Sequence, residues 1–556
     1  MRNLLLLFLL LAAGCAQVET QPDVVVITVI GTNDVHGELV EQSGRGGLTT
    51  FSGYVNAVRK ARADDGGVLL VDAGDMWQGT LESNLNEGYS VVEAYNALGY
   101  AAAAIGNHEF DFGPLGPKSI PDGDGDDPQG ALRARASKAN FPLLGANLID
   151  ASTGEMVEWD NVQASAVVQR AGVLIGVIGV LTEATPATTI AANVRGLEIA
   201  PLAETIEQQA QTLRLAGASL IVVVAHAGSR CTEFDDPYDT SSCRMDGEIM
   251  RVAQALPPGL VDHIVAGHEH QGIAHDVNGI AVTAAYSNTR AFSRVDFTID
   301  RTSGEIIDRR IFPPQPIVAG GNYEGRDVVP DEQVVAIAGL AQDMAARRRA
   351  ESLGVDMEEP MLHRTRPESP LGNLFTDAML QMNDADIAIH NVWGGIRAEL
   401  PEGELTYGDV YRVFPFDNRV SIIELTGEQL RSIVAIQAHN RRRAAGFSGM
   451  RVYVSCDAND MQVSMLRPDG SEIADEDVLR VVANDFLLLG GDSILTPVTP
   501  EEGFQIPNGT PLVRETLVAW FRANPGEMDP DDFVDPDALR WNLPTDLPAD
   551  CQLSGG

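Results

Sequence analysis

The sequence has little positive charge. Its 39 lysines and arginines stand against 79 aspartates and glutamates, which gives a formal net charge of −40 at pH 7. A protein that binds DNA or RNA needs a basic surface to neutralise the phosphate backbone, so this balance argues against a nucleic-acid polymer as a partner. A small anionic substrate is not excluded, because a bound pair of metal ions can reverse the local field.

The apolar run at the start of the chain is short. Residues 4–13 are too few to span a bilayer as a helix, but they fit the apolar segment of an export signal. Residues 11–15 resemble a lipobox, in which Cys15 becomes the acylated N-terminus; the alternative is an ordinary cleaved signal with an incidental cysteine. We therefore predict that residues 1–23 are a lipoprotein signal peptide and tether, and that lipidated Cys15 anchors an exported protein to a membrane of the periplasm or cell envelope.

Cysteine is also scarce. Beyond Cys15 the chain has four cysteines, which allow three disulfide pairings. Export favours disulfides, and we favour Cys231 with Cys243, across one short loop, and Cys456 with Cys551, which would tie down the C-terminus. No CxxC spacing occurs, which argues against a cysteine zinc site.

The length and the apolar content predict more than one packed domain. Although aromatic residues make up only 6% of the 556 residues, 44% are apolar, and a chain of this length exceeds one typical core. Strand-like runs alternate with amphipathic helical segments in the first half, which predicts an α/β layered domain. The predicted strands are 24–30, 68–71, 173–180, 220–224 and 263–265.

The predicted domain boundaries follow changes in this pattern. The first domain covers residues 24–310, and a linker at 311–354 contains a long hinge helix around 331–353. A smaller α/β (α+β) domain covers 355–523, and an acidic, proline-rich tail at 524–556 is expected to be peripheral.

Polar residues gather directly after the predicted strands of the first half. The first two strands are followed by Asp34 and His36, and by Asp72 and Asp75; a third segment contains Asn107, His108, Glu109 and Asp111; the last two strands are followed by His226, and by His268 and His270. The carboxyl ends of strands form the ligand crevice of α/β sheets. Mixed oxygen and nitrogen donors suit metals such as zinc or manganese, and one carboxylate can bridge two ions. We therefore predict a site for two divalent metal ions.

The order of these blocks resembles a known family. Asp-x-His, Gly-Asp-x-x-x-Gly, Gly-Asn-His-Glu, His-x-Gly and Gly-His-x-His follow one another as in the calcineurin-like metallophosphoesterases. More narrowly, Gly-Asn-His-Glu-Phe-Asp and the second half resemble the bacterial periplasmic 5′-nucleotidase/UDP-sugar hydrolase family. The resemblance covers nearly the whole chain after residue 23, and it implies a four-layer α/β/β/α domain followed by a smaller nucleotide-binding domain.

The resemblance implies a role for each residue of the site. Asp34, His36, Asp75 and His270 would hold one metal, although His270 occupies a position where such enzymes often carry an amide. Asp75, as the bridge, Asn107, His226 and His268 would hold the other. His108 and Asp111 would be the catalytic pair, with a helix or turn cap as the alternative for Asp111. Asp72 and Glu109 are expected to support the ligands, while His263 and His275 are expected to be core or surface residues.

The second half of the chain would bind and select the substrate. The resemblance implies that Arg397 contacts phosphate with help from Arg364 or Arg366, and that Phe416 and Phe486 sandwich the base, with core packing as their alternative. Asn418 would contact the base edge and Asp492 the ribose hydroxyls. This chain has one residue more than the family between Asn391 and Gly394, so a substrate contact from Asn391 or Trp393 is left open.

These features predict an extracytoplasmic dimetal phosphohydrolase. It would release inorganic phosphate from nucleoside 5′-monophosphates by direct attack of a metal-bound hydroxide. Alternatives with the same metal blocks are a 2′,3′-cyclic-nucleotide phosphodiesterase/3′-nucleotidase and a UDP-sugar or dinucleotide pyrophosphatase. A lipid-anchored nucleotide-binding or adhesion protein with a vestigial site is the alternative from another class, and the complete ligand set argues against it.

Overall fold

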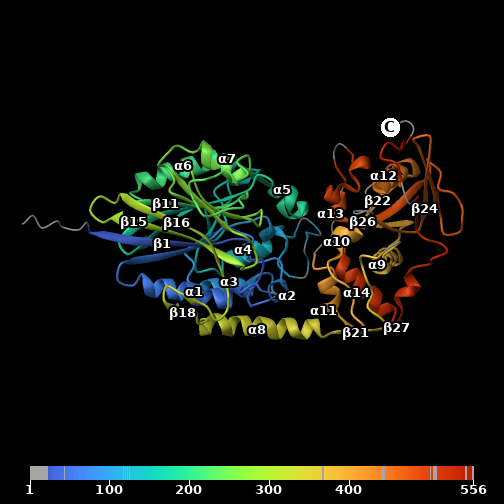
Figure 1. The fold of residues 1–556 in the computed structure, drawn as a ribbon, viewed down its shortest axis with the longest axis horizontal. Coiled ribbons are helices and arrows are strands. Elements are labelled where there is room, and N and C mark those ends of the chain that lie inside the picture. The colour runs from blue at the N-terminus through green and yellow to red at the C-terminus, as the bar shows by residue number, and fades with distance from the viewer. Residues whose placement is uncertain are drawn as a thin grey trace, which may run out of the picture.

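The chain forms two α/β domains joined by one long helix (Figure 1). The computed structural model describes residues 23–553, apart from 43, 117, 119, 122, 124, 366–367, 417, 440–444, 501–502, 505–509 and 545–546. The predicted signal peptide with Cys15, and Arg366 among the expected substrate residues, lie outside the described residues.

The first domain contains two large β-sheets. The seven-stranded sheet has the order β16-β15-β1-β2-β3-β4-β7, and the six-stranded sheet has the order β13-β14-β12-β11-β9-β8. In the first sheet, β1 to β4 and β7 are parallel, β15 is antiparallel to β1, and β16 is antiparallel to β15. Their bounds are β1 Val24–Thr32, β2 Gly66–Asp72, β3 Ala102–Ala104, β4 Leu143–Leu144, β7 Val162–Gln163, β15 Ala291–Asp300 and β16 Ile306–Pro316. Those of the second sheet are β8 Ser165–Arg170, β9 Val173–Leu181, β11 Leu220–His226, β12 His263–Ala266, β13 Gly272–Val277 and β14 Ile280–Ala285.

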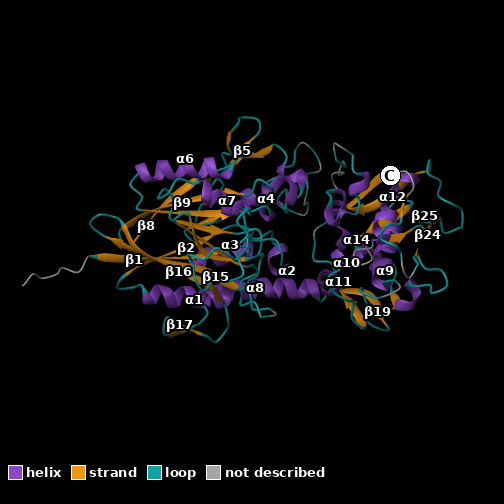
Figure 2. Ribbon diagram, turned by 45° about the horizontal axis from the view of Figure 1, so that its top comes forward, coloured by secondary structure: helices purple, strands orange, loops and turns teal. Residues whose placement is uncertain are grey.

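The two sheets pack face to face between two layers of helices (Figure 2). One core lies between the sheets, formed by residues such as Val29 of β1 and Val222 of β11. A second core joins the seven-stranded sheet to α1 (Gly47–Ala61), α3 (Tyr89–Leu98) and α4 (Gly130–Ala136). A third joins the six-stranded sheet to α6 (Leu202–Leu215) and α7 (Glu248–Ala255). The predicted α/β/β/α architecture is confirmed, and so are the predicted strands.

The helix between the domains is α8 (Glu332–Arg349), and its N-cap Asp331 accepts from the backbone N–H groups of Gln333 and Val334. Val334, Ala338 and Ala341 pack into the first domain's core, whereas Ala345 packs into the core of the second domain. Because one face of α8 is shared between two cores, the helix is a packed part of both domains rather than a free linker. The linker boundary predicted at 311 falls inside β16, which runs to Pro316 within the first sheet, so residues 311–316 belong to the first domain.

The second domain is built from three smaller sheets, with the orders β22-β26-β20-β23, β21-β19-β27 and β28-β24-β25-β29. Three of these strands come from residues 526–553, and Cys551 is buried. The expectation of a peripheral tail was therefore wrong: strand pairing holds that segment in the domain. The bounds are β19 Ser352–Met357, β20 Ile387–His390, β21 Gly403–Thr406, β22 Val420–Thr426, β23 Gly446–Ser448, β24 Arg451–Asp457, β25 Asp460–Leu466, β26 Val478–Asn484, β27 Gly526–Met528, β28 Trp541–Asn542 and β29 Gln552–Leu553.

Helices pack against these sheets in two hydrophobic cores. They are α9 Pro370–Gln381, α10 Val392–Gly395, α11 Tyr407–Val413, α12 Gly427–His439, α13 Asp485–Leu488 and α14 Val513–Ala523. The short helices α10 and α13 lie on the side that faces the first domain (Figure 1). Both predicted disulfides are present, Cys231–Cys243 and Cys456–Cys551. Among the helices of the described part, none is both long and apolar enough to cross a membrane.

Candidate metal centre and active site

The expected metal ligands lie at the carboxyl ends of neighbouring strands. Asp34 and His36 follow β1, Asp75 follows β2, and Asn107 follows β3 in the first sheet. In the second sheet His226 ends β11, and His268 and His270 follow β12, which is parallel to β11. Strand β1 runs toward the second domain, so this end of the sheets lies on the side of α10 and α13 (Figure 1).

Two groups of potential ligands share the carboxylate of Asp75. The first is Asp34, His36, Asp75 and His270, and the second is Asp75, His226 and His268; within each group the ligand atoms lie within 4.8 Å of one another. The amide oxygen of Asn107 joins the second group, at 2.9 Å from Nε2 of His226 and 3.0 Å from Nδ1 of His268. The structure thus brings all the expected ligands together.

The potential ligand atoms of these groups lie within hydrogen-bond distance of one another. Nδ1 of His36 lies 2.8 Å from the carbonyl of Gln78, which can only accept, so a neutral His36 presents an unprotonated Nε2. That Nε2 lies 3.0 Å from Nε2 of His270. In the second group the Nδ1 of His226 lies 2.9 Å from the carbonyl of Ala73, so its Nε2 faces Oδ1 of Asn107. Imidazole nitrogens, carboxylate oxygens and an amide oxygen that converge in this way are the donor set that divalent ions such as zinc and manganese take, so the residues fit a metal pair.

The electrostatics of the second group favour a positive charge. Burial lowers the pKa of His226, but the carboxylate of Asp75, 3.1 Å from its Nε2, outweighs burial and raises that pKa to about 9. Without a metal ion, a proton is therefore favoured between Nε2 of His226 and Asp75, where a metal ion would bind. Burial also lowers the pKa of His36, which keeps that ring neutral and able to bind a metal.

The ligands are held by an unusual backbone. Asp34, His36, Asp75, His268 and His270 all have φ between 50° and 74°, in the left-handed region that non-glycine residues rarely adopt. Such strain costs about 1–3 kcal/mol per residue and persists only where the surrounding structure imposes it, which is common at functional sites. The strand-end loops are therefore shaped for ligand geometry rather than for stability.

His108 and Asp111 form a second feature beside the metal ligands. Nδ1 of His108 lies 2.6 Å from Oδ2 of Asp111, and the hydroxyl of Thr189 donates to Oδ1 of the same carboxylate at 2.8 Å. The His108 ring lies edge-on to the ring of His36, with 5.4 Å between their centroids. Burial lowers the pKa of His108, but Asp111 and Asp75 outweigh it and raise that pKa to about 10. The contacts show that Asp111 orients His108 and is not only a turn cap.

Glu109 and Asp72 hold the loops that carry the ligands. The buried carboxylate of Glu109 accepts from the backbone N–H groups of Asp75, Met76 and Gly106, at 2.7–2.8 Å. Asp72 accepts from Thr32, Tyr95 and the backbone of Gly74. Both side chains therefore support the ligand loops, as the sequence predicted.

The second domain brings three of its expected substrate segments together. Oδ2 of Asp492 accepts from Nδ2 of Asn391 at 2.7 Å and lies against Gly394, where an added Cβ would come within 2.3 Å of it. The Arg397 guanidinium lies 5.0 Å from the ring centre of Phe416. Asn418 donates to Asp485, the residue before Phe486, at 3.2 Å. Phe486 is 41% exposed, whereas Phe416 is half-buried, and Arg364 lies on an exposed loop.

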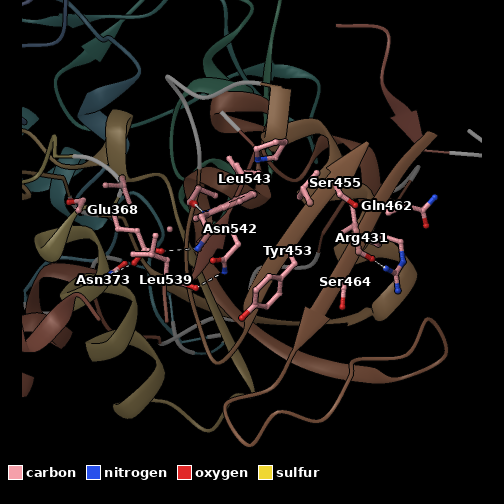
Figure 3. A pocket seen from close by; sticks show the side chains of 18 of the residues that line it. Glu368, Asn373, Arg431, Tyr453, Ser455, Gln462, Ser464, Leu539, Asn542 and Leu543 are labelled. Atoms are coloured by element: carbon pink, nitrogen blue, oxygen red, sulfur yellow. Dashed lines mark hydrogen bonds between the residues drawn. The ribbon is translucent and has the colours of Figure 1, made fainter. Parts of the chain in front are cut away.

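A cavity of about 960 Å³ in the second domain adjoins the segment that contains Asn391 and Gly394 (Figure 3). Trp393 and Val392 line it, together with Glu368, Tyr453 and Trp541. Trp393, for which a substrate contact was left open, is in this lining, but none of the expected metal, catalytic or substrate residues of the described chain is, so the cavity lies beside the candidate site.

Two residues of the site, Asn33 and Thr189, were not predicted from the sequence. Asn33 donates to Asp34 at 2.7 Å, and Thr189 holds Asp111 from a loop far along the chain. Asn33 stands in the first strand-end block and could have been suspected there. Thr189 follows no strand and no motif. His263 and His275 are buried core residues, as expected.

Comparisons with known families support this reading of both domains. Residues 27–272 match the calcineurin-like phosphoesterase family, and residues 352–499 match the 5′-nucleotidase C-terminal domain family. The chain is 28% identical to the cell wall protein Lmo0130 of Listeria monocytogenes, over 84% of this chain and 64% of that protein. It is 28% identical to endonuclease YhcR of Bacillus subtilis, over 88% and 39%. The chain thus spans less than two thirds of the length of these two relatives.

A relative of similar length and two solved structures are also similar to both domains of this chain. Protein UshA of Escherichia coli is 25% identical over 87% of this chain and 88% of that protein. The 5′-nucleotidase precursor of Thermus thermophilus superposes with a TM-score of 0.61 and 24% identity, over 94% of this chain and 100% of that one. A putative 5′-nucleotidase of Staphylococcus aureus gives a TM-score of 0.68 at 17% identity, over 93% and 99%. At these identities the structural likeness shows the fold.

Proposed function

Because the chain belongs to the calcineurin-like phosphoesterases that carry a 5′-nucleotidase C-terminal domain, we propose that it releases inorganic phosphate from nucleoside 5′-monophosphates. The observation that carries the proposal is the pair of ligand groups that share Asp75, with the His108–Asp111 pair beside them. This arrangement suits hydrolysis of a phosphate ester and lies on the side that faces the second domain (Figure 1).

The metal ligands would hold two divalent ions of the zinc or manganese type. Asp34, His36 and His270 would bind one ion; Asn107, His226 and His268 would bind the other; Asp75 would bridge them. When bound, the two ions would supply positive charge for the phosphate oxygens and activate the attacking water.

His108 would act on the leaving group. Its Nδ1 is engaged by Asp111, so its Nε2 is the atom that can carry a proton to the departing nucleoside oxygen. The hydroxyl of Thr189 fixes the carboxylate of Asp111, and this contact holds the imidazole in one orientation. The half-buried side chain of His108 leaves room for a substrate at its outer edge.

The second domain would hold the nucleotide. Arg397 would bind phosphate through its planar guanidinium, and exposed Phe486 would stack on the base together with Phe416. Asn418 would meet the base edge and Asp492 the ribose hydroxyls. Stacking tolerates any base, so we expect loose base preference.

The enzyme would work outside the cytoplasm. Its two disulfides are typical of oxidising compartments, and one relative is named a cell wall protein. A lipid anchor at Cys15 stays a prediction, which mass spectrometry of the membrane-extracted protein would test.

The decisive experiment is a substrate panel with added zinc or manganese. Phosphate release is measured from nucleoside 5′-monophosphates, 2′,3′-cyclic nucleotides, UDP-sugars and dinucleotides, with His108→Ala as the control. We expect fast release from the 5′-monophosphates and little from the control. Equal release by wild type and control would overturn the proposal, and a preference for another substrate of the panel would replace its substrate class.

A further inference from the structure

The metal ligand His36 is held by the loop that follows Asp75. We call residues 76–84, which end in the short helix α2 (Leu81–Asn84), the His36 loop. The carbonyl of Gln78 accepts from Nδ1 of His36 at 2.8 Å, and the backbone N–H of Thr80 donates to the carbonyl of His36 at 3.2 Å. Gly79 lies so close to His36 that an added Cβ would come within 2.3 Å of the His36 carbonyl oxygen. The position of this loop therefore sets the position of His36.

The same loop is held by a tyrosine of the second domain. The hydroxyl of Tyr411, on α11, donates to the carbonyl of Gly79 at 2.7 Å. It also accepts from Nδ2 of Asn84 at 3.1 Å, and Oδ1 of Asn84 accepts from the backbone N–H of Gly79 at 3.0 Å. Tyr411, Asn84 and Gly79 thus form a closed ring of hydrogen bonds that spans the domain boundary and engages both backbone groups of Gly79.

Two further contacts tie the His36 loop to the other side of the boundary. Leu81 is 2% exposed and belongs to the hydrophobic core of the second domain. Glu82 makes two hydrogen bonds, at 2.7 and 2.6 Å, with the guanidinium of Arg349 at the end of α8. At its other end the loop is anchored in the first domain by Trp77, which is fully buried. The loop therefore belongs to both domains.

We propose that Tyr411 is a positioning residue for the metal centre: through Gly79 and the His36 loop, the second domain sets the geometry of the ligand His36. The inference rests on the proposed function, because it requires that the group of Asp34, His36, Asp75 and His270 binds a metal ion. It adds that the affinity of that group depends on a residue of the other domain. An interface that only holds the domains together would leave metal affinity unchanged.

Tyr407 provides a matched control on the same helix. Its hydroxyl donates to Glu515 at 2.8 Å and accepts from Nε of Arg514 at 3.3 Å, and both partners lie within the second domain. Tyr411→Phe and Tyr407→Phe each remove one phenolic hydroxyl from α11. A general loss of stability would therefore appear in both variants, and a loss of metal affinity only in the first.

The test is calorimetric titration of the full-length, metal-stripped protein with zinc or manganese. We expect Tyr411→Phe to weaken binding of one of the two ions by about tenfold, since changes in groups that orient metal ligands typically cost 10–100-fold. Tyr407→Phe should bind both ions as the wild type does. Excess metal should restore the phosphate-release rate of Tyr411→Phe, with KM for the nucleotide unchanged. Asn84→Ala, which opens the same ring from the first domain, should weaken the same ion.

The outcomes separate this inference from the proposed function. If the wild type binds two ions and Tyr411→Phe and Asn84→Ala bind them equally well, the role of Tyr411 is overturned and the proposed function stands. An equal loss of affinity in Tyr407→Phe would also overturn that role, because it would make the effect general. If the wild type binds no ion, both the proposed function and this inference fall.

Discussion

The Nε2 atoms of His36 and His270 lie 3.0 Å apart, in a group of potential metal ligands that also contains the carboxylates of Asp34 and Asp75. The contact predicts that metal ions stabilise the fold. A ligand that binds only the folded state at 100 times its Kd adds about 2.7 kcal/mol to the free energy of unfolding. We expect chelation to lower the Tm and added zinc or manganese to restore it, as followed by calorimetry.

Two histidine variants locate this stabilisation. His270→Ala should reduce the metal-dependent rise in Tm, because it removes a ligand of the first group. His275→Ala removes a buried imidazole of the same domain, and it should lower the Tm while leaving the metal-dependent rise intact. A rise of equal size in the His270 variant and the wild type would show that His270 binds no metal.

The catalytic pair should be separable from the metal ligands. General acid catalysis contributes about 10²–10⁴-fold, so His108→Ala should lower kcat by that factor. Asp111→Asn, which removes the carboxylate that orients the ring, should lower kcat by about 10–100-fold. Both variants should still bind two ions, as measured by metal analysis after gel filtration. Loss of an ion from either protein would assign that residue to metal binding instead.

Phe486 should contribute to nucleotide binding and little to stability. Its ring is 41% exposed, so Phe486→Ala removes little core packing. Stacking of one base on an aromatic ring is worth about 1–3 kcal/mol, so KM for a nucleoside 5′-monophosphate should rise about 5–150-fold. Ribose 5-phosphate, which has no base, should be hydrolysed equally well by the variant and the wild type. An equal loss on both substrates would argue against stacking.

Residues that act from their own strand end could be predicted from the sequence. Asp34, Asp75 and His226 follow buried strands, and parallel strands place their carboxyl ends at one edge whatever the loops do. The layers of the first domain could also be predicted, because apolar runs of strand length alternate with amphipathic helices in the sequence. The local sequence pattern therefore predicts those site residues whose position depends only on the order of the strands.

Residues that act across long separations could not be predicted in this way. Thr189 reaches Asp111 from 78 positions along the chain, and Tyr411 reaches Gly79 across the domain boundary from 332 positions away. Neither lies in a motif, because its role is set by tertiary packing alone. The segment 526–553 was misjudged for a similar cause: its acidic, proline-rich composition resembles a loose tail, while its strands pair with partners that local sequence does not reveal.

The two disulfides should differ in their contribution to stability. Cys456 and Cys551 are separated by 95 residues, and Cys231 and Cys243 by 12. In the chain-entropy account, closing the longer loop stabilises by about 4.7 kcal/mol and closing the shorter one by about 3 kcal/mol. Paired serine variants, Cys456→Ser with Cys551→Ser and Cys231→Ser with Cys243→Ser, should therefore lower the free energy of unfolding to different extents in urea. The opposite order would show that native contacts outweigh loop entropy.

His263 should make the fold sensitive to acid. Burial, with a smaller effect of Arg309, lowers the pKa of His263 to about 3, whereas an unfolded histidine has a pKa of about 6.5. Below pH 6.5 the unfolded chain binds a proton that the folded chain does not, so the free energy of unfolding falls as pH falls from 6.5 toward 3. The slope from this one group approaches about 1.4 kcal/mol per pH unit.

The variant His263→Gln isolates this contribution. It removes the titrating group, so it should be less stable than the wild type at pH 7 and lose less stability on acidification. The metal ligands titrate equally in both proteins, and their effect cancels in the difference. Urea unfolding at pH 7, 6 and 5, in the presence of a chelator, should therefore show a gap between the two proteins that narrows as pH falls. Parallel stability curves would mean that His263 binds a proton as readily in the folded protein as in the unfolded chain, and they would contradict the lowered pKa of this buried side chain.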